Sequence, residues 1–178
     1  LAIVGSFVSA DEGGNSLEWH ARFGYFILSL LIFRLVWGVV GSHYAQFFNF
    51  IKSPKTVLAY LKNPTEVPGH NPLGALSVIA LLGFLLLQAV TGLFASDDIA
   101  FEGPLSKYVS SNWVELLTSF HRLDETVLIL LIALHVGAIV YYRWIKKVNL
   151  VKPMITGDKE WAEKIPAARD DFLLRLFE

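Results

Sequence analysis

Residues 72–95 of the chain read PLGALSVIALLGFLLLQAVTGLFA and contain no charged side chain. A helix needs about 20 mostly apolar residues to cross a hydrocarbon core roughly 30 Å thick, so this stretch is long enough to span a membrane. Residues 21–41, with Arg34 as the charge in their interior, and residues 126–142 have the same character. The sequence therefore predicts an all-α membrane protein, a transmembrane helix bundle with three full spans.

The composition agrees with a membrane location and excludes several classes of function. Of the 178 residues, 54% are hydrophobic and 17% are charged, whereas a soluble domain has about 45–50% apolar and about 25% charged residues. The net charge of −1 leaves no basic stripe to neutralise phosphates, which argues against a nucleic-acid partner. The chain has no cysteine, and this excludes disulfides, iron–sulfur clusters and covalently attached c-type haem.

The first eight residues, Leu1–Val8, form an apolar run that is too short to cross a bilayer as a helix. We interpret this run as the remnant of an upstream helix, in which case the intact protein has four spans. The alternative is a short ordered arm. The length of the chain suits a single transmembrane domain over residues 1–178.

The segments between the spans carry their own helix signals. Ser53 is a suitable N-cap and Pro54 a suitable first residue for a short amphipathic helix over residues 53–61, at the membrane interface. The pair Asn71-Pro72 repeats this start signal at the second span. A second interfacial helix is predicted over residues 106–118, ahead of the third span.

Basic and acidic segments alternate along the chain between the predicted spans. Lys52, Lys55 and Lys62 follow the first span, and the third span is followed by Arg143, Lys146, Lys147 and Lys152. The segment before the first span and the one between the second and third spans are mainly acidic. Because short cytoplasmic loops carry the excess of Lys and Arg, we predict that the tail, residues 143–178, is cytoplasmic and that the acidic segments face out.

Histidines are spaced so that they share helix faces. The chain has five, at His20, His43, His70, His121 and His135. His121 and His135 are 14 residues apart. At 100° per residue, 14 residues come within about 40° of a whole number of helical turns, so both side chains lie on one face of the helix. The rise between them along the helix axis is about 21 Å. His20 and Arg34 have the same spacing. Each of the two spans therefore presents two polar groups on one face, at two depths.

The predicted topology pairs some of these groups by depth. His20 and His121 both lie at the outer side, where two imidazoles from different helices can bind one haem iron from its two faces. His135 lies deeper, toward the cytoplasm, and needs a partner from the inner side, which is either His70 or a histidine on an upstream segment. Arg34 lies at that inner level, where it neutralises a haem propionate or, alternatively, extends its charge to the lipid headgroups.

Structural roles remain the alternative for several of these residues. A single histidine at the headgroup level is usually only a polar surface group, and this is the preferred interpretation for His43 and an open one for His70. His135 lies within the apolar stretch 130–139, where an unpaired charge would cost several kcal/mol, so a ligand role is favoured. Gly24, one turn after His20, suits either a flat macrocycle or close helix packing.

Several stretches of the chain resemble the bacterial di-haem cytochrome b family, which includes the membrane subunit of nickel–iron hydrogenases. They occur in the right order over nearly the whole chain: WHARFGY at 19–25, RLVWGVVGSHYAQF at 34–47, GHNPLGAL at 69–76, TGLFA at 91–95 and LHVGA at 134–138. Each motif alone is weak, but together they are specific.

The resemblance implies a four-helix bundle in the bacterial inner membrane with two b haems, and with at least one of them in this chain. It implies electron exchange with quinone or with a hydrogenase-like or cytochrome c-like redox partner. By position, His20 and His121 correspond to the ligands of the outer haem and His135 to one ligand of the inner haem. The remaining ligand belongs to the family's first helix, which places it upstream of Leu1 and argues against His70.

Two other classes of function remain open from sequence alone. One is a proton or solute transporter that uses His135 and Arg34 as relay groups. The other is a non-redox membrane anchor with the charged tail as a docking surface. A visible spectrum of the purified protein distinguishes them, because only the electron carrier shows reducible b-type absorption.

Overall fold

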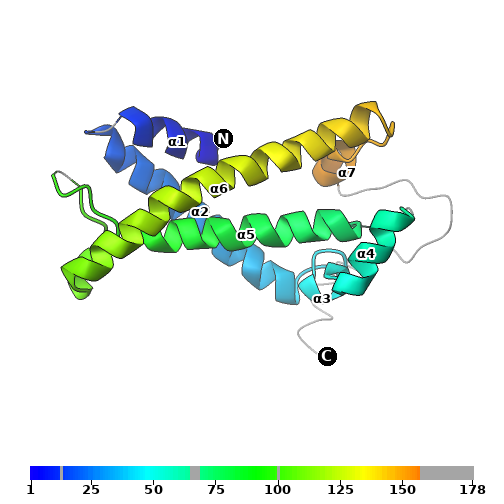
Figure 1. The fold of residues 1–178 in the computed structure, drawn as a ribbon, viewed down its shortest axis with the longest axis horizontal. Coiled ribbons are helices and arrows are strands. Elements are labelled where there is room, and N and C mark those ends of the chain that lie inside the picture. The colour runs from blue at the N-terminus through cyan, green and yellow to red at the C-terminus, as the bar shows by residue number, and fades with distance from the viewer. Residues whose placement is uncertain (13, 65–68, 100, 157–178) are drawn as a thin grey trace. The chain divides into compact units, whose positions relative to one another are not determined.

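The computed structural model describes residues 1–12, 14–64, 69–99 and 101–156 (Figure 1), and the last 22 residues of the predicted tail, 157–178, lie outside them. The described elements are α1 (Ala2–Glu12), α2 (Ser16–Val40), α3 (Phe47–Phe50), α4 (Pro54–Lys62), α5 (Pro72–Gly92), a 3₁₀ turn (Ser106–Tyr108), α6 (Ser111–Trp144) and α7 (Val151–Thr156). Of these, α2, α5 and α6 are long and apolar enough to cross a membrane. The predicted all-α fold with three full spans is confirmed.

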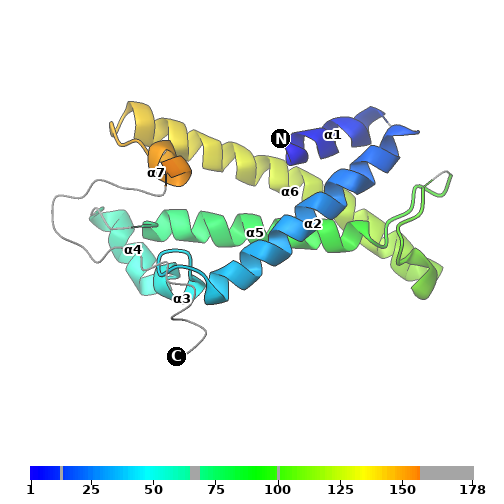
Figure 2. The same ribbon diagram turned by 180° about the vertical axis from the view of Figure 1, so that it is seen from behind.

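The chain divides into two compact units, and each of the three long helices contributes to both. Among the described residues, the first unit contains those of 1–34 and 81–130, and the second contains those of 35–80 and 131–156. In the first unit α1 folds back along the beginning of α2 (Figure 2), and a hydrogen-bond contact of 2.9 Å joins the Ser6 carbonyl to His20 Nδ1. The apolar run 1–8 is therefore mostly helical and belongs to α1.

The third span begins earlier than the sequence indicates. The predicted interfacial helix over residues 106–118 is wrong, because only Ser106–Tyr108 forms a short 3₁₀ turn and the residues from Ser111 onward belong to α6. The Ser110 carbonyl accepts the N–H groups of Trp113 and Val114 at 2.9 and 3.1 Å. No proline or glycine follows until Gly137, so nothing interrupts the helix. His121 consequently lies inside α6 and not ahead of it.

Few side chains are fully buried in the first unit, as expected for helices that face lipid. Leu31 and Leu128 are its buried apolar side chains, at 4% and 2% exposure, and Thr91 is buried as well. Large apolar residues such as Phe26 and Phe33 of α2 are exposed. In a bilayer these side chains meet hydrocarbon, so their exposure carries no hydrophobic penalty.

The segment that links α5 to α6 folds tightly against the end of α5. Gly103 donates its N–H to the Ala95 carbonyl at 2.8 Å, and Leu105 donates to the Leu93 carbonyl at 2.9 Å. A Cβ on Gly103 would lie 2.5 Å from the Leu93 oxygen, so only glycine allows this close approach. The link therefore closes over that end of α5.

The second unit contains α4, the short helix that the sequence predicts over residues 53–61. Ser53 caps α4 by accepting a hydrogen bond from the Thr56 N–H at 3.3 Å, and Pro54 occupies the first turn. The one buried residue of α4, Tyr60, lies with its hydroxyl 3.2 Å from that of Tyr142 on α6. Burial and this hydrogen bond raise the pKa of Tyr60 to about 12, so the phenol is neutral at physiological pH.

The predicted start signal of the second span is confirmed. Asn71 caps α5 by accepting the Gly74 N–H at 2.7 Å. Its side-chain amide also donates to the Tyr142 hydroxyl at 3.4 Å. This asparagine therefore joins the first turn of α5 to the end of α6 within the second unit.

Candidate functional site

A cavity of about 450 Å³ opens in the first unit among α1, α2, α5 and α6. Its volume falls within the range of about 300–1,000 Å³ that small-molecule and cofactor sites occupy. Apolar side chains such as Leu17, Leu85 and Leu128 line part of it. The polar and small residues that matter for its chemistry are His20, Gly24, Gln88, Gly92, His121 and Arg122.

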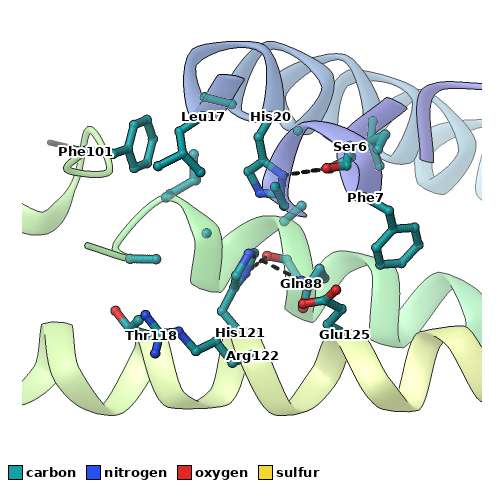
Figure 3. Close-up of a pocket in the computed structure, with 18 of the residues that line it drawn as sticks. Ser6, Phe7, Leu17, His20, Gln88, Phe101, Thr118, His121, Arg122 and Glu125 are labelled. Carbon is teal, nitrogen blue, oxygen red and sulfur yellow. Dashed lines mark hydrogen bonds between the residues drawn. The ribbon is translucent and has the colours of Figure 1, made fainter. Parts of the chain in front are cut away.

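His20 and His121 point toward each other across this cavity from different helices (Figure 3). Their ring centroids are 5.9 Å apart and the ring planes meet at 86°. A metal bound by an imidazole nitrogen on each side, at about 2 Å from each, requires centroids roughly 6 Å apart. The two rings therefore stand close to the separation that a pair of axial ligands needs, as the depth argument predicts.

Each of these rings is oriented through its Nδ1 atom. Nδ1 of His20 lies 2.9 Å from the Ser6 carbonyl oxygen, and Nδ1 of His121 lies 2.9 Å from the Gln88 carbonyl oxygen. A carbonyl can only accept, so both Nδ1 atoms carry the proton and the lone pair of each neutral ring is on Nε2. Metal-binding histidines commonly donate their second nitrogen to a carbonyl in this way, which fixes tautomer and orientation.

Two glycines shape the cavity around these histidines. A Cβ on Gly92 would lie 2.9 Å from Cε1 of His121, so the absence of a side chain lets the ring approach α5 closely. A Cβ on Gly24 would meet nothing within 4 Å, which leaves that part of the cavity wall open. Both features suit a flat group placed beside the rings.

The two imidazoles fit a metal cofactor whose other ligands come from the cofactor itself. Over the described ranges, no three His, Asp or Glu side chains gather as they would around a bare metal ion. Two opposed imidazoles without further ligands suit an iron whose four equatorial nitrogens come from a macrocycle. The residues present in the first unit therefore fit a haem.

The second unit contains His135, on α6. Its Nδ1 lies 3.0 Å from the Ser77 hydroxyl on α5, and its side chain is half-buried. His70 lies elsewhere in this unit: its ring rests against Phe50 with centroids 4.9 Å apart, in a cavity that His135 does not line. The structure thus brings His20 to His121 but places His70 and His135 in different surroundings.

Half-buried Arg34 lies in α2. Its predicted contact with a haem propionate stays a prediction.

Several residues of the site are absent from the sequence-based prediction. Gln88 is the one amide in the span 72–95, whose other polar side chains are Ser77 and Thr91, and that could have identified it. Thr91 places its hydroxyl 3.2 Å from His121 Nδ1. Ser6 contacts His20 Nδ1 through its backbone carbonyl at 2.9 Å and its hydroxyl at 3.2 Å, and no residue pattern identifies a carbonyl acceptor.

Comparison with known proteins supports the redox interpretation. The family model of prokaryotic cytochrome b561 matches residues 1–157, which confirms the resemblance to bacterial b-type cytochromes of the hydrogenase membrane-subunit type. Neither a search of curated proteins nor a search of solved structures returned a match. Members of the family bind b-type haem and transfer electrons in the bacterial inner membrane. The chain therefore belongs to the prokaryotic cytochrome b561 family, as a membrane protein that carries electrons on b-type haem.

Proposed function

We propose that His20 and His121 are the two axial ligands of one b haem in the first unit. The observation that carries this proposal is the opposed pair of rings, 5.9 Å apart, with both Nδ1 atoms held by backbone carbonyls. A haem bound between two imidazoles has no open iron position, so it supplies one-electron transfer and not oxygen binding.

The surrounding residues orient the ligands and set their basicity. The Ser6 and Gln88 carbonyls hold the rings in the tautomer that presents Nε2, and such hydrogen bonds also make the ligand more basic. A more basic ligand stabilises the oxidised metal and lowers its reduction potential. Apolar side chains such as Leu17, Leu85 and Leu128 line part of the cavity and lower the dielectric there.

His135 is proposed as one ligand of a second b haem. It lies on the same continuous helix as His121, fourteen residues further along α6. Its Nδ1 lies 3.0 Å from the Ser77 hydroxyl, which can accept the Nδ1 proton and would then leave the Nε2 lone pair for iron. His70 lines a cavity that His135 does not line and is not proposed as the opposite ligand, and Arg34 is the candidate partner of a propionate.

Replacing Ser77 with alanine should raise the reduction potential of the haem on His135 without releasing it. The variant removes the hydroxyl 3.0 Å from Nδ1. With Ser77 as the acceptor of the Nδ1 proton, its loss makes the ring a weaker donor to iron. A potentiometric titration followed in the visible spectrum measures the shift. Ser29→Ala is the matched control, because Ser29 is exposed on α2 and donates only to the Tyr25 carbonyl. Equal potentials in Ser77→Ala and wild type would rule out this positioning role.

The proposed electron path connects quinone or a redox protein with the other face of the membrane. Its test uses liposomes that contain the purified haem-loaded protein, with ferricyanide trapped inside and a water-soluble quinol added outside. We expect wild-type protein to reduce the trapped ferricyanide and His135→Ala to do so no faster than empty liposomes. If His135→Ala matched wild type, electrons would not cross by way of this residue.

The orientation of the chain is proposed from its basic residues, with α4 and the residues after α6 on the cytoplasmic side. The protein has no native cysteine, so single introduced cysteines report the side directly. We expect Ser110→Cys, in the segment before α6, to react with an impermeant maleimide in intact spheroplasts. Lys55→Cys on α4 should react only in inverted vesicles. The opposite labelling pattern would reverse the proposed orientation.

A further inference from the structure

A second cavity, of about 550 Å³, lies in the second unit and takes no part in the proposed haem binding. It is formed by the connector between α2 and α5, and its lining includes His43, Asn49, Lys52, Tyr60, Asn63 and His70. The span α2 ends and the span α5 begins on the same side of the membrane. The connector, and the cavity within it, therefore lie at that membrane face.

The lining of this second cavity is cationic and rich in hydrogen-bond donors. Its described residues include Lys52 but no Asp or Glu. The Lys52 ammonium donates one hydrogen bond to the Asn49 carbonyl at 2.9 Å and retains two further N–H groups. The Asn49 side-chain amide donates to the His43 carbonyl at 2.7 Å and to the Gln46 side-chain oxygen at 2.9 Å, and the His43 imidazole supplies a further N–H. These donors suit an anion.

Parts of the cavity wall are held in place by contacts within the second unit. The His70 ring rests against buried Phe50, with ring centroids 4.9 Å apart. Buried Tyr60 is fixed through its hydroxyl contact with Tyr142 at 3.2 Å. A ligand that enters the cavity therefore meets a largely preformed wall.

Exposed apolar side chains flank the cavity on α3 and α4. Phe48 and Leu58 are 84% and 61% exposed, and Ile51 and Leu61 are exposed as well. A soluble anion would make no contact with such an apolar surface, whereas the hydrocarbon chains of an amphiphile with a charged head would cover it. The ligand chemistry indicated here is thus a phosphate attached to apolar chains.

We propose that this cavity binds the headgroup of an anionic phospholipid, with phosphatidylglycerol as the test case, and that its acyl chains lie along α3 and α4. Basic pockets between helices on the cytoplasmic side of membrane proteins bind anionic headgroups, because that leaflet has a negative surface potential. Lys62, exposed on α4, adds to the local positive charge. The proposal does not depend on which residues bind haem.

The test titrates the full-length, haem-loaded protein in neutral detergent with short-chain phosphatidylglycerol and counts bound lipid by native mass spectrometry. Wild type should bind phosphatidylglycerol in preference to phosphatidylcholine. Lys52→Gln and His43→Gln should each bind it roughly tenfold or more weakly, since each loses a hydrogen bond to a charged group. Lys52→Arg should retain binding. Lys55→Gln is the matched control, because it removes the same charge from the same connector outside the cavity lining.

Three results would overturn the proposal. Equal weakening in Lys55→Gln and Lys52→Gln would mean diffuse charge attraction without a site. Displacement of the lipid by equimolar inorganic phosphate would mean a site for a soluble anion. Displacement by a short-chain quinone would assign the cavity to a quinone headgroup. Unchanged haem spectra in all four variants would show that the lipid result is independent of the haem assignment.

Discussion

Replacing His20, replacing His121 or replacing both with alanine should cost the protein the same amount of haem. The reason is that the two rings face each other at 5.9 Å and are proposed to grip one iron, so losing either one releases the haem that the other holds. Adding His135→Ala to any of these three variants should lower the haem bound per protein further, because His135 is proposed to bind a different haem. Haem extracted into alkaline pyridine and divided by protein concentration measures this pattern.

The control for this series is His43→Ala. His43 is exposed and lines the other cavity, so its replacement should leave haem content at the wild-type value. If the double variant lost twice as much haem as either single variant, His20 and His121 would bind separate haems. That outcome would contradict the shared iron while leaving the family assignment intact.

Replacing Gly92 with alanine should also release the first-unit haem, although both proposed ligands stay in place. The added Cβ would lie 2.9 Å from Cε1 of His121, closer than real Cβ atoms come. The ring would have to move away from α5 and lose its 2.9 Å hydrogen bond to the Gln88 carbonyl. We expect a large loss of haem from the first unit, measured as haem retained after purification.

Gly83→Ala is the matched control, because it makes the same change in the same helix. A Cβ there would meet nothing within 4 Å, and alanine is favoured over glycine in a helix by up to about 1 kcal/mol. This variant should keep its haem and unfold at the same or a higher temperature. Equal haem loss in Gly83→Ala and Gly92→Ala would mean that α5 tolerates no alanine, and the contact with His121 would not be the cause.

The spans and the facing histidines could be predicted from sequence because each leaves a strong pattern. A membrane-spanning helix requires about 20 mostly apolar residues, and the uncharged stretch 72–95 meets that requirement directly. Alternating basic and acidic loops placed His20 and His121 at one depth, and the structure brings their rings together. The start of α6 at Ser111 was missed because a mixed-polarity segment hides a helix that nothing interrupts.

The orientation of the ligands was beyond sequence reasoning. Ser6 and Gln88 hold the two rings through their carbonyl oxygens, and every residue has a carbonyl. Ser77 looks like any small residue in an apolar helix, and only the packing of α5 against α6 shows that it faces His135. Gly92 likewise matters because of one neighbouring ring, a contact that depends on tertiary packing.

The most direct test of the shared iron is the low-temperature electron paramagnetic resonance spectrum of the oxidised protein, recorded for wild type and for His20→Ala. Two imidazoles from α2 and α6 on one iron predict that the first-unit haem contributes a low-spin signal to the wild-type spectrum. In His20→Ala, the low-spin signal of the first-unit haem should disappear or be replaced by a high-spin signal. An unchanged low-spin spectrum in His20→Ala would contradict the assignment.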